Sequence, residues 1–327
     1  MSRYIETTMT AFPIAGSFTI SRGSKTEAEV VTCVIHDGVH RGHGECVPYG
    51  RYGETIDSVM AQIAAVAGAI AGGLDRNGLM AEMKPGAARN AVDCALWDLE
   101  AKLSGTSVAS NLGIAAPKPL TTAYTISLGE PEAMAAQAAA HAHRDLLKVK
   151  VGTPDDRSRI RAVRAGAPNS TIILDANEGW SEETIAAHIA VAAEERIALI
   201  EQPLPAGHDA ILAAIDRTVT ICADESVHDR KGLADLRDRY DAINIKLDKT
   251  GGLTEALLLK EEAERLGFRI MVGCMVGSSL AMAPAVLLAQ GVDFVDLDGP
   301  LLLARDREPG LVYRDSLVFP PEAALWG

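Results

Sequence analysis

The feature that most constrains this chain is a series of short β-branched or apolar runs, which recur at an even pitch from Thr121 onward. Helical stretches rich in Ala, Glu and Leu fill most of the gaps between them. Strands and helices that alternate in this way form a parallel sheet with helical crossovers. The candidate strands are TTAYTISL, LLKVKV, TIILDAN, IALIEQP, TICADES, DAINIKL, RIMVGCM and FVDLDG. Eight such strands close naturally into an α/β barrel.

Charged residues collect at the ends of these runs, after the apolar residues. In a parallel barrel, the carboxyl ends of all strands open onto one face, where barrel enzymes hold their catalytic groups. Successive charged positions advance by about one strand-helix unit, so we expect neighbouring positions to be adjacent around the ring. They are Lys148, Lys150, Asp175, Glu201, Asp224, Lys246, Asp296 and Asp298. The sequence therefore predicts that residues far apart in the chain meet at one mouth.

Residues 1–115 differ in character from the strand-helix series. Strand-like stretches at 27–37 and 39–47 precede helical stretches at 54–72 and 87–103. This pattern predicts a separate α+β domain ahead of the barrel.

The end of the chain offers no clear eighth helix. We place the barrel at 116–300 and expect the segment 301–327 to return and pack on the first domain. This segment contains Pro309, Gly310, Pro320 and Pro321.

Charge and cysteine content argue against several classes of partner. The formal net charge is -13 and no Lys/Arg block is present, so a nucleic-acid partner is not expected and a small molecule is. The five cysteines are scattered without metal-ligand spacing, which indicates reduced thiols. The apolar stretch 59–70 is too short to span a membrane, and the N-terminus does not resemble a secretory signal. We therefore expect a cytoplasmic protein without a membrane partner.

Three acids stand at the ends of successive strands: Asp175, Glu201 and Asp224. They supply hard oxygen ligands, which suit Mg²⁺ and leave its other positions to water and a substrate carboxylate. A structural alternative is that each acid caps a helix or pairs with a lysine. Three acids in register favour the metal site.

Lysines flank the same mouth. Lys148 and Lys150 share one face of their strand because side chains alternate with period two. A solvated strand edge is the bland alternative, but barrel strands are buried. Lys246 lies on the sixth strand, across the ring from Lys150. A carbon acid bound between them could lose a proton to one lysine and regain one from the other, while a metal stabilises the enediolate charge. We expect nearby cations to lower the lysine pKa values.

Several motifs resemble the muconate-lactonizing subgroup of the enolase superfamily over essentially the whole chain. They are LKVKV, LDANEGW, EQPLP, ADES and NIKLDKTGG. Within that subgroup, further runs resemble dipeptide epimerases, most closely the L-Ala-D/L-Glu epimerases. These runs are GECVPYGRYGE, AARNAVDCALWDLEAK, NIKLDKTGGLTEAL, GCMVGSS and DLDGP.

The resemblance implies a capping α+β domain over a modified (β/α)7β barrel of the TIM type. It implies that Asp175, Glu201 and Asp224 bind one Mg²⁺ per subunit. It also implies an isomerase of cell-wall (murein) peptide recycling that takes a dipeptide substrate and forms a homo-oligomer.

The resemblance also assigns roles around the substrate. Lys150 and Lys246 would be the acid/base groups of a 1,1-proton transfer, and Lys148 would stabilise charge on the bound carboxylate. Asp296 and Asp298 would hold the α-ammonium group, with Thr125 as a further substrate contact.

Arg22, in the run SRGSKTEAE, is expected on a capping-domain loop that closes over the mouth. There it could pair with a substrate side-chain carboxylate in bidentate fashion. The bland alternative is a solvated loop arginine.

Other functions remain open from sequence alone. The same apparatus could epimerise different dipeptides, or use one lysine for β-elimination or cycloisomerisation, as in o-succinylbenzoate synthase and muconate cycloisomerase. A non-catalytic, metal-stabilised binding barrel is a third alternative.

Overall fold

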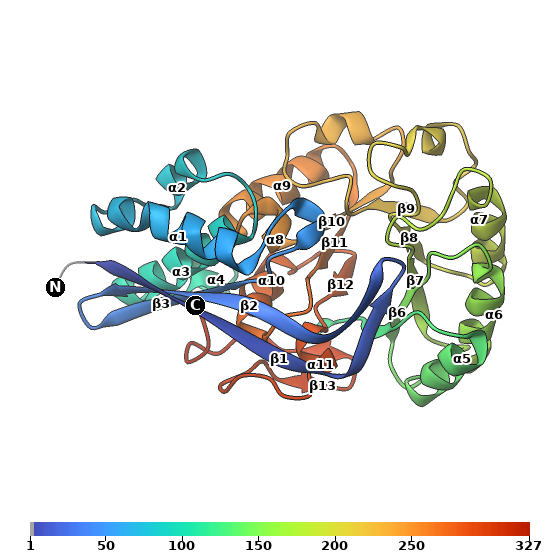
Figure 1. Cartoon of the computed structure of the whole chain (residues 1–327), viewed down its shortest axis with the longest axis horizontal. Helices are drawn as coiled ribbons and strands as arrows, with labels where there is room; N and C mark the ends of the chain where they lie inside the picture. The colour runs from blue at the N-terminus through green and yellow to red at the C-terminus, as the bar shows by residue number, and fades with distance from the viewer. Residues whose placement is uncertain (1–2) are drawn as a thin grey trace.

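The computed structural model describes residues 3–327 as a capping domain beside a barrel (Figure 1). Eight parallel strands of the barrel follow one another around the sheet in chain order. They are β5 (Tyr124–Ile126), β6 (Leu146–Lys150), β7 (Thr171–Asp175), β8 (Leu199–Glu201), β9 (Thr220–Ala223), β10 (Ala242–Ile245), β11 (Arg269–Gly273) and β12 (Phe294–Asp296). At the seam between β12 and the chain entering β5, the Ala123 N–H donates to the Val295 carbonyl at 2.9 Å. The predicted eight-stranded α/β barrel is confirmed.

Connections between the strands are mostly helical. Helices of ten residues or more follow five of the strands: α5 (Pro131–Ala140), α6 (Asp156–Gly166), α7 (Ile185–Glu194), α9 (Leu253–Arg265) and α10 (Ser279–Leu288). The connections on either side of β9 hold only the short 3-10 helices η2 (Ala210–Ala213) and η3 (Leu233–Leu236). In the first, Pro203, Pro205 and Gly207 interrupt any longer helix because proline lacks a backbone donor and glycine is flexible.

Side chains that point into the barrel form two layers. The lower layer is one buried apolar cluster of Ala123, Leu146, Ile173, Leu199, Cys222, Ala242, Met271 and Phe294. Two residues further along each strand, period-two alternation turns the next side chain inward. The upper layer thereby consists of Thr125, Lys148, Asp175, Glu201, Asp224, Asn244, Gly273 and Asp296. The apolar layer closes the floor beneath a polar one.

Gly273 leaves a gap in the upper layer. A Cβ atom at this position would lie 2.7 Å from the amide of Asn244 on the neighbouring strand. The missing side chain therefore makes room for Asn244 to extend across the interior.

The capping domain pairs three antiparallel strands with helices. The strands β1 (Tyr4–Ile20), β2 (Gly23–Asp37) and β3 (His40–Cys46) form its sheet. Its helices are α1 (Ile56–Ala71), α2 (Arg76–Glu82), α3 (Ala87–Ser104) and α4 (Val108–Asn111). At Gly44 a Cβ atom would lie 2.0 Å from the Ala91 carbonyl, so glycine lets α3 pack directly on β3. The β1–β2 hairpin extends from the capping domain along the barrel (Figure 1).

The segment 301–327 contacts both parts of the molecule. Its strand β13 (Tyr313–Arg314) pairs with β14 (Leu317–Val318), and β14 pairs with β4 (Leu120–Thr121), ahead of the barrel. The Trp326 indole donates to the Cys94 carbonyl of α3 at 3.0 Å. The exact domain boundaries at 115 and 300 stay predictions. Residues 3–327 contain no helix suited in length and hydropathy to span a bilayer.

Asp248 joins the capping domain to the barrel from α8 (Leu247–Thr250), which directly follows β10. Its Oδ1 accepts the Val47 N–H at 3.0 Å and the Asn90 side-chain N–H at 2.8 Å. Burial raises the pKa of this carboxyl to about 7, although both hydrogen bonds favour the anion. The interface therefore holds an acid whose charged form is unfavourable.

This raised pKa predicts how Asp248→Asn changes stability with pH. The folded protein binds the Asp248 proton more tightly than the unfolded chain, so the contribution is favourable below the ordinary pKa and is lost as pH rises toward 7. Asparagine keeps the accepting oxygen without the charge. Relative to the parent, we expect Asp248→Asn to gain stability between pH 4 and 8, on the order of a few kcal/mol. Urea unfolding of both proteins across that range measures the gap, and parallel pH curves would contradict the expectation.

Candidate active site

A cavity of about 1070 Å³ lies between the capping domain and the carboxyl ends of the barrel strands. The β1–β2 hairpin and the 3-10 helix η1 (Gly50–Tyr52) form its outer wall. From the barrel, its lining includes Thr125, Lys148, Lys150, Asp224, Lys246, Asp296 and Asp298. Arg22 lines it from the hairpin. Most of the predicted site residues therefore share one cavity, with Asp175 and Glu201 fully buried below it.

Strand register aligns the acids side by side. Lys150 pairs with Asp175 across β6 and β7, and Asp175 pairs with Glu201 across β7 and β8. Glu201 in turn pairs with Cys222, so Asp224 is the next inward position, just beyond the end of β9. The predicted convergence of these strand ends is present in the structure.

Lys148 lies at the centre of this acidic group. Its Nζ is 2.6 Å from Glu201 Oε2, 2.7 Å from Asp296 Oδ2 and 3.0 Å from Asp175 Oδ2. Burial opposes the charge on this lysine, but Asp175, Asp296 and Glu201 outweigh it and hold its pKa well above the ordinary value. The surrounding acids thus favour the ammonium form of Lys148.

Lys150 and Lys246 stand on opposite sides of the barrel, on β6 and directly after β10, four strands apart in the sheet. Lys150 Nζ is 2.6 Å from Asp175 Oδ2, and Lys246 Nζ is 2.7 Å from Asp224 Oδ2. The two lysines therefore pair with different carboxylates.

The pKa of Lys246 is raised, whereas the sequence analysis expects neighbouring cations to lower the lysine pKa values. Burial and Lys148 do act in that direction, but Asp224 and Glu201 raise the pKa of Lys246 well above its ordinary value. The acids nearest the ammonium group dominate because they are buried at ion-pair distance.

The pKa values of the buried acids are shifted in different directions. At Asp175, Glu201 and Asp224, burial acts to raise the pKa and the neighbouring lysines act to lower it. At Asp175, Lys148 and Lys150 outweigh burial and hold the pKa below its ordinary value. At Glu201, burial and the charge of Asp175 dominate and raise the pKa to about 8. Glu201 Oε2 also receives no well-directed hydrogen bond, although Lys148 Nζ lies close to it.

Two further buried residues hold these acids, and the sequence analysis did not single them out. Lys249, on α8, donates to Asp224 Oδ1 and to the Asp224 carbonyl, both at 2.6 Å, and to the Asn244 carbonyl at 2.9 Å. The Asn244 side chain donates to Glu201 Oε1 at 2.6 Å. Strand periodicity could have identified Asn244, because it lies two residues before Lys246 on the same face.

The last strand places Asp296 and Asp298 beside β5. Asp298 Oδ2 accepts the Thr125 backbone N–H at 2.6 Å, and burial together with Asp296 raises its pKa to about 6. Asp296 Oδ1 is buried and has no hydrogen-bond partner. The pair thus offers an acceptor for a cationic group inside the cavity. Thr125 contributes to this part of the site through its main-chain N–H, which binds Asp298.

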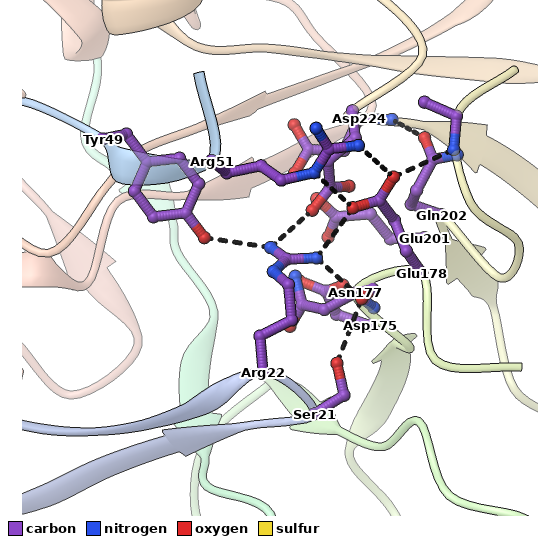
Figure 2. Close-up of polar contacts among 12 residues, drawn as sticks. Ser21, Arg22, Tyr49, Arg51, Asp175, Asn177, Glu178, Glu201, Gln202 and Asp224 are labelled. Carbon is purple, nitrogen blue, oxygen red and sulfur yellow. Dashed lines mark hydrogen bonds and ion pairs between the residues drawn. The ribbon is translucent and has the colours of Figure 1, made fainter. Parts of the chain in front are cut away.

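Arg22 lies at the tip of the β1–β2 hairpin, with its guanidinium group held by protein acceptors (Figure 2). Its Nη1 donates to the Asn177 carbonyl at 2.7 Å and to Glu178 at 3.1 Å. Its Nη2 donates to the Tyr49 hydroxyl at 2.9 Å and to Glu225 at 2.8 Å. The expected substrate role of Arg22 therefore stays a prediction.

The donor chemistry of the mouth suits a hard cation. Asp175, Glu201 and Asp224 supply buried carboxylate oxygens on successive strands, and one Glu201 oxygen lacks a directed hydrogen bond. Within residues 3–327, no trio of acidic, histidine or cysteine side chains forms a ready-made metal cage. Lysine ammonium groups lie between the carboxylates and neutralise them.

The contacts of Lys249 predict a structural role in this site. Lys249→Met would remove the ammonium donor that two carbonyl groups and one carboxylate oxygen of the buried cluster share. We expect a loss of about 3 kcal/mol in the free energy of unfolding. The control is Lys260→Met, because Lys260 pairs with Glu264 near the surface of α9 and should contribute at most ~0.5 kcal/mol. Equal losses for the two variants in denaturant unfolding would refute the role of Lys249.

Family models match both parts of the chain. The model described as "Enolase C-terminal domain-like" matches residues 132–321. The model of the mandelate racemase / muconate lactonizing enzyme N-terminal domain matches residues 4–113.

Individual relatives cover almost the whole chain. The L-Ala-D/L-Glu epimerase of Escherichia coli (strain K12) is 47% identical over 93% of this chain and 95% of its own length. A crystal structure from Agrobacterium tumefaciens shows an enolase family member with homology to dipeptide epimerases, with bound sodium and L-Ala-L-Glu. It is 64% identical, with a TM-score of 0.99 over 99% of this chain and 100% of that chain.

A more distant structure holds a different ligand. The dipeptide epimerase of Cytophaga hutchinsonii, complexed with Mg and D-Ala-L-Val, is 29% identical. Its TM-score is 0.91 over 98% of this chain and 94% of that chain. From these matches and the barrel with its capping domain, the chain belongs to the enolase superfamily, in the mandelate racemase and muconate lactonizing enzyme family.

Proposed function

We propose that this protein is an isomerase that epimerises dipeptides, with L-Ala-D/L-Glu as its substrate. The observation that supports it most is the position of Lys150 and Lys246 on opposite sides of one cavity. Two proton-carrying groups that flank a stereocentre can invert it, because one removes the proton and the other returns a proton to the opposite face. A one-base elimination or cycloisomerisation would use only one of the two lysines as its base, whereas inversion uses both.

The proton transfer requires one lysine as amine and the other as ammonium. The amine takes the α-proton of the C-terminal residue and becomes an ammonium group, and the opposite ammonium donates its proton and becomes an amine. The total charge of the lysine pair is unchanged. Lys148, whose charged form the surrounding acids favour, would face the substrate carboxylate and stabilise the charge that develops on it.

A divalent metal, Mg²⁺, completes this proposal, with Asp175, Glu201 and Asp224 as its ligands. It would supply positive charge to the substrate carboxylate and thereby acidify the neighbouring α-carbon. With these carboxylates occupied, Lys246 would lose part of the stabilisation of its charged form, which favours the amine that a base requires.

Asp296 and Asp298 are proposed to bind the substrate α-ammonium group. The unpartnered Asp296 Oδ1 supports this assignment, because a buried carboxylate oxygen gains most from a cationic donor. Thr125 fixes Asp298 through its main-chain N–H. Arg22 is proposed as a contact for the substrate side chain, which would require it to exchange one of its protein acceptors.

The relatives also motivate broader proposals. Cell-wall peptide recycling in the cytoplasm, a homo-oligomeric state and one Mg²⁺ per subunit are consistent with an L-Ala-D/L-Glu epimerase. A second candidate is another dipeptide, since the Cytophaga hutchinsonii relative is complexed with D-Ala-L-Val.

Isotope exchange tests the reaction directly. In D₂O with Mg²⁺, we expect the protein to incorporate deuterium at the Glu α-carbon of L-Ala-L-Glu while the D-Glu epimer accumulates, as measured by NMR. Lys150→Ala and Lys246→Ala should each lower kcat by at least about 10²-fold, because each removes one acid/base group. The N-acetylated dipeptide, which lacks the ammonium group, is the matched substrate control. Absence of exchange across a panel of dipeptides would refute the function.

The same assay separates epimerisation from elimination or cycloisomerisation. Substrates of those reactions lack an ammonium group, so Asp296→Asn with Asp298→Asn should weaken turnover of dipeptides only.

Metal binding is tested by thermal unfolding after removal of metal with EDTA. We expect Mg²⁺ at a hundredfold excess over its Kd to stabilise the parent by about 2.7 kcal/mol. Asp224→Asn should lose most of this shift because it removes a ligand. Glu225→Gln is the matched control, since it neutralises the adjacent buried acid and should retain the shift. Equal shifts for both variants would contradict the ligand assignment.

A further inference from the structure

Two arginines of the capping domain converge on one glutamate of the barrel, Glu178 (Figure 2). Arg51, on η1, donates from Nε and Nη2 to the two carboxylate oxygens of Glu178, each at 2.9 Å. Arg22, from the hairpin tip, reaches the same carboxylate at 3.1 Å. A bidentate arginine-carboxylate pair is strong and directional. The Glu178 side chain thus contacts both elements of the outer cavity wall, through one arginine from each.

The barrel holds Glu178 in place for these contacts. Its side chain is 8% exposed, and its carboxylate also accepts the Ala206 N–H from the loop after β8 at 2.9 Å. Its backbone has a left-handed φ of 67°, and Asn177 before it has a φ of 45°. Such conformations are uncommon outside glycine and persist where the surroundings fix them. This turn directs the Asn177 carbonyl and the Glu178 carboxylate toward the capping domain.

The hairpin tip has further contacts to the same turn. The Ser21 hydroxyl donates to the Asn177 carbonyl at 3.0 Å, beside the bond from Arg22. The turn itself begins two residues after Asp175, whose carboxylate Oδ1 accepts the Asn177 N–H at 3.0 Å. Closure of the capping domain and the position of a buried acid are therefore connected through one short turn.

We propose that Glu178 is a positioning residue of the proposed epimerase, which holds the hairpin tip and η1 closed over the cavity through Arg22 and Arg51. It does not touch the reacting atoms. Glu178 raises the fraction of molecules in which the cavity wall is closed. When this fraction falls, the apparent affinity for substrate falls in proportion. A closed wall also keeps water from the two lysines.

This inference rests on the proposed function for its kinetic test. Glu178→Gln keeps the shape of the side chain and removes its charge. We expect the KM for L-Ala-L-Glu to rise about tenfold while kcat stays within about twofold, because the residues around the reacting carbon are unchanged. Arg51→Met should raise KM similarly, and the double variant should be no worse than the more affected single one, because both break the same contact.

The matched control is Glu100→Gln. Glu100 pairs with Arg76 at 2.8 Å within the capping domain, where the pair is partly exposed and does not line the cavity. This variant should leave KM unchanged. If Glu178→Gln lowers the melting temperature but also leaves KM unchanged, the contact is merely structural and the proposal is wrong.

Limited trypsin digestion gives a second readout without substrate. Arg22 and Arg51 are engaged by Glu178 in the parent, so cleavage after either residue should be slow. In Glu178→Gln we expect cleavage at both sites to accelerate at least about fivefold, as measured by mass spectrometry, and not in Glu100→Gln. Equal cleavage rates in parent and variant would overturn the proposal. If the parent turned over no dipeptide, the proposed function would fail, and this digestion would still decide whether Glu178 closes the cavity.

Discussion

The charged mouth of the barrel depends on the apolar layer directly beneath it. Each strand turns one apolar side chain inward and, two residues later, a polar or charged one, except where Gly273 leaves space. The apolar layer excludes water from below, and buried charges are tolerated only when they are paired. The lysines and acids at the mouth neutralise one another at distances of 2.6 to 3.0 Å. The composition of the strands thus fixes both the stability of the barrel and the polarity of its cavity.

The capping domain contributes the rest of the cavity from a distant part of the chain. Its apolar residues Phe12, Ile14 and Val47 cluster with Met275 and Leu303 near the barrel mouth. This contact is non-directional, so it brings the two parts together without fixing the loops that face the substrate. Directional contacts between the two parts include those at Glu178, Asn177 and Asp248. The residues that hold the capping domain against the barrel therefore differ from those that orient its loops over the cavity.

The sequence predicted the barrel well because its signal is local and repeated. All eight predicted runs contain a barrel strand, and the acids at their ends adjoin one another because parallel register aligns those ends. Strand β1 was not predicted, since Pro13 and Gly16 interrupt its pattern, and the structure accommodates them with a register shift between Pro13 and Phe18. The pKa of Lys246 was expected to be lowered because the sequence shows cations nearby but not their distance from the acids. The two arginine partners of Glu178 come from more than a hundred positions away, which no spacing rule reveals.

The space above Gly273 is filled by Asn244, so the residues tolerated at positions 273 and 244 depend on each other. Any larger residue there meets the amide of Asn244, while a smaller residue in place of Asn244 would leave a hole and remove the donor to Glu201. Each single replacement is costly, and only a joint exchange could preserve both volume and hydrogen bonding. The volume available at position 273 and the side chain at position 244 are therefore coupled, and a tolerated substitution at one position depends on the residue at the other.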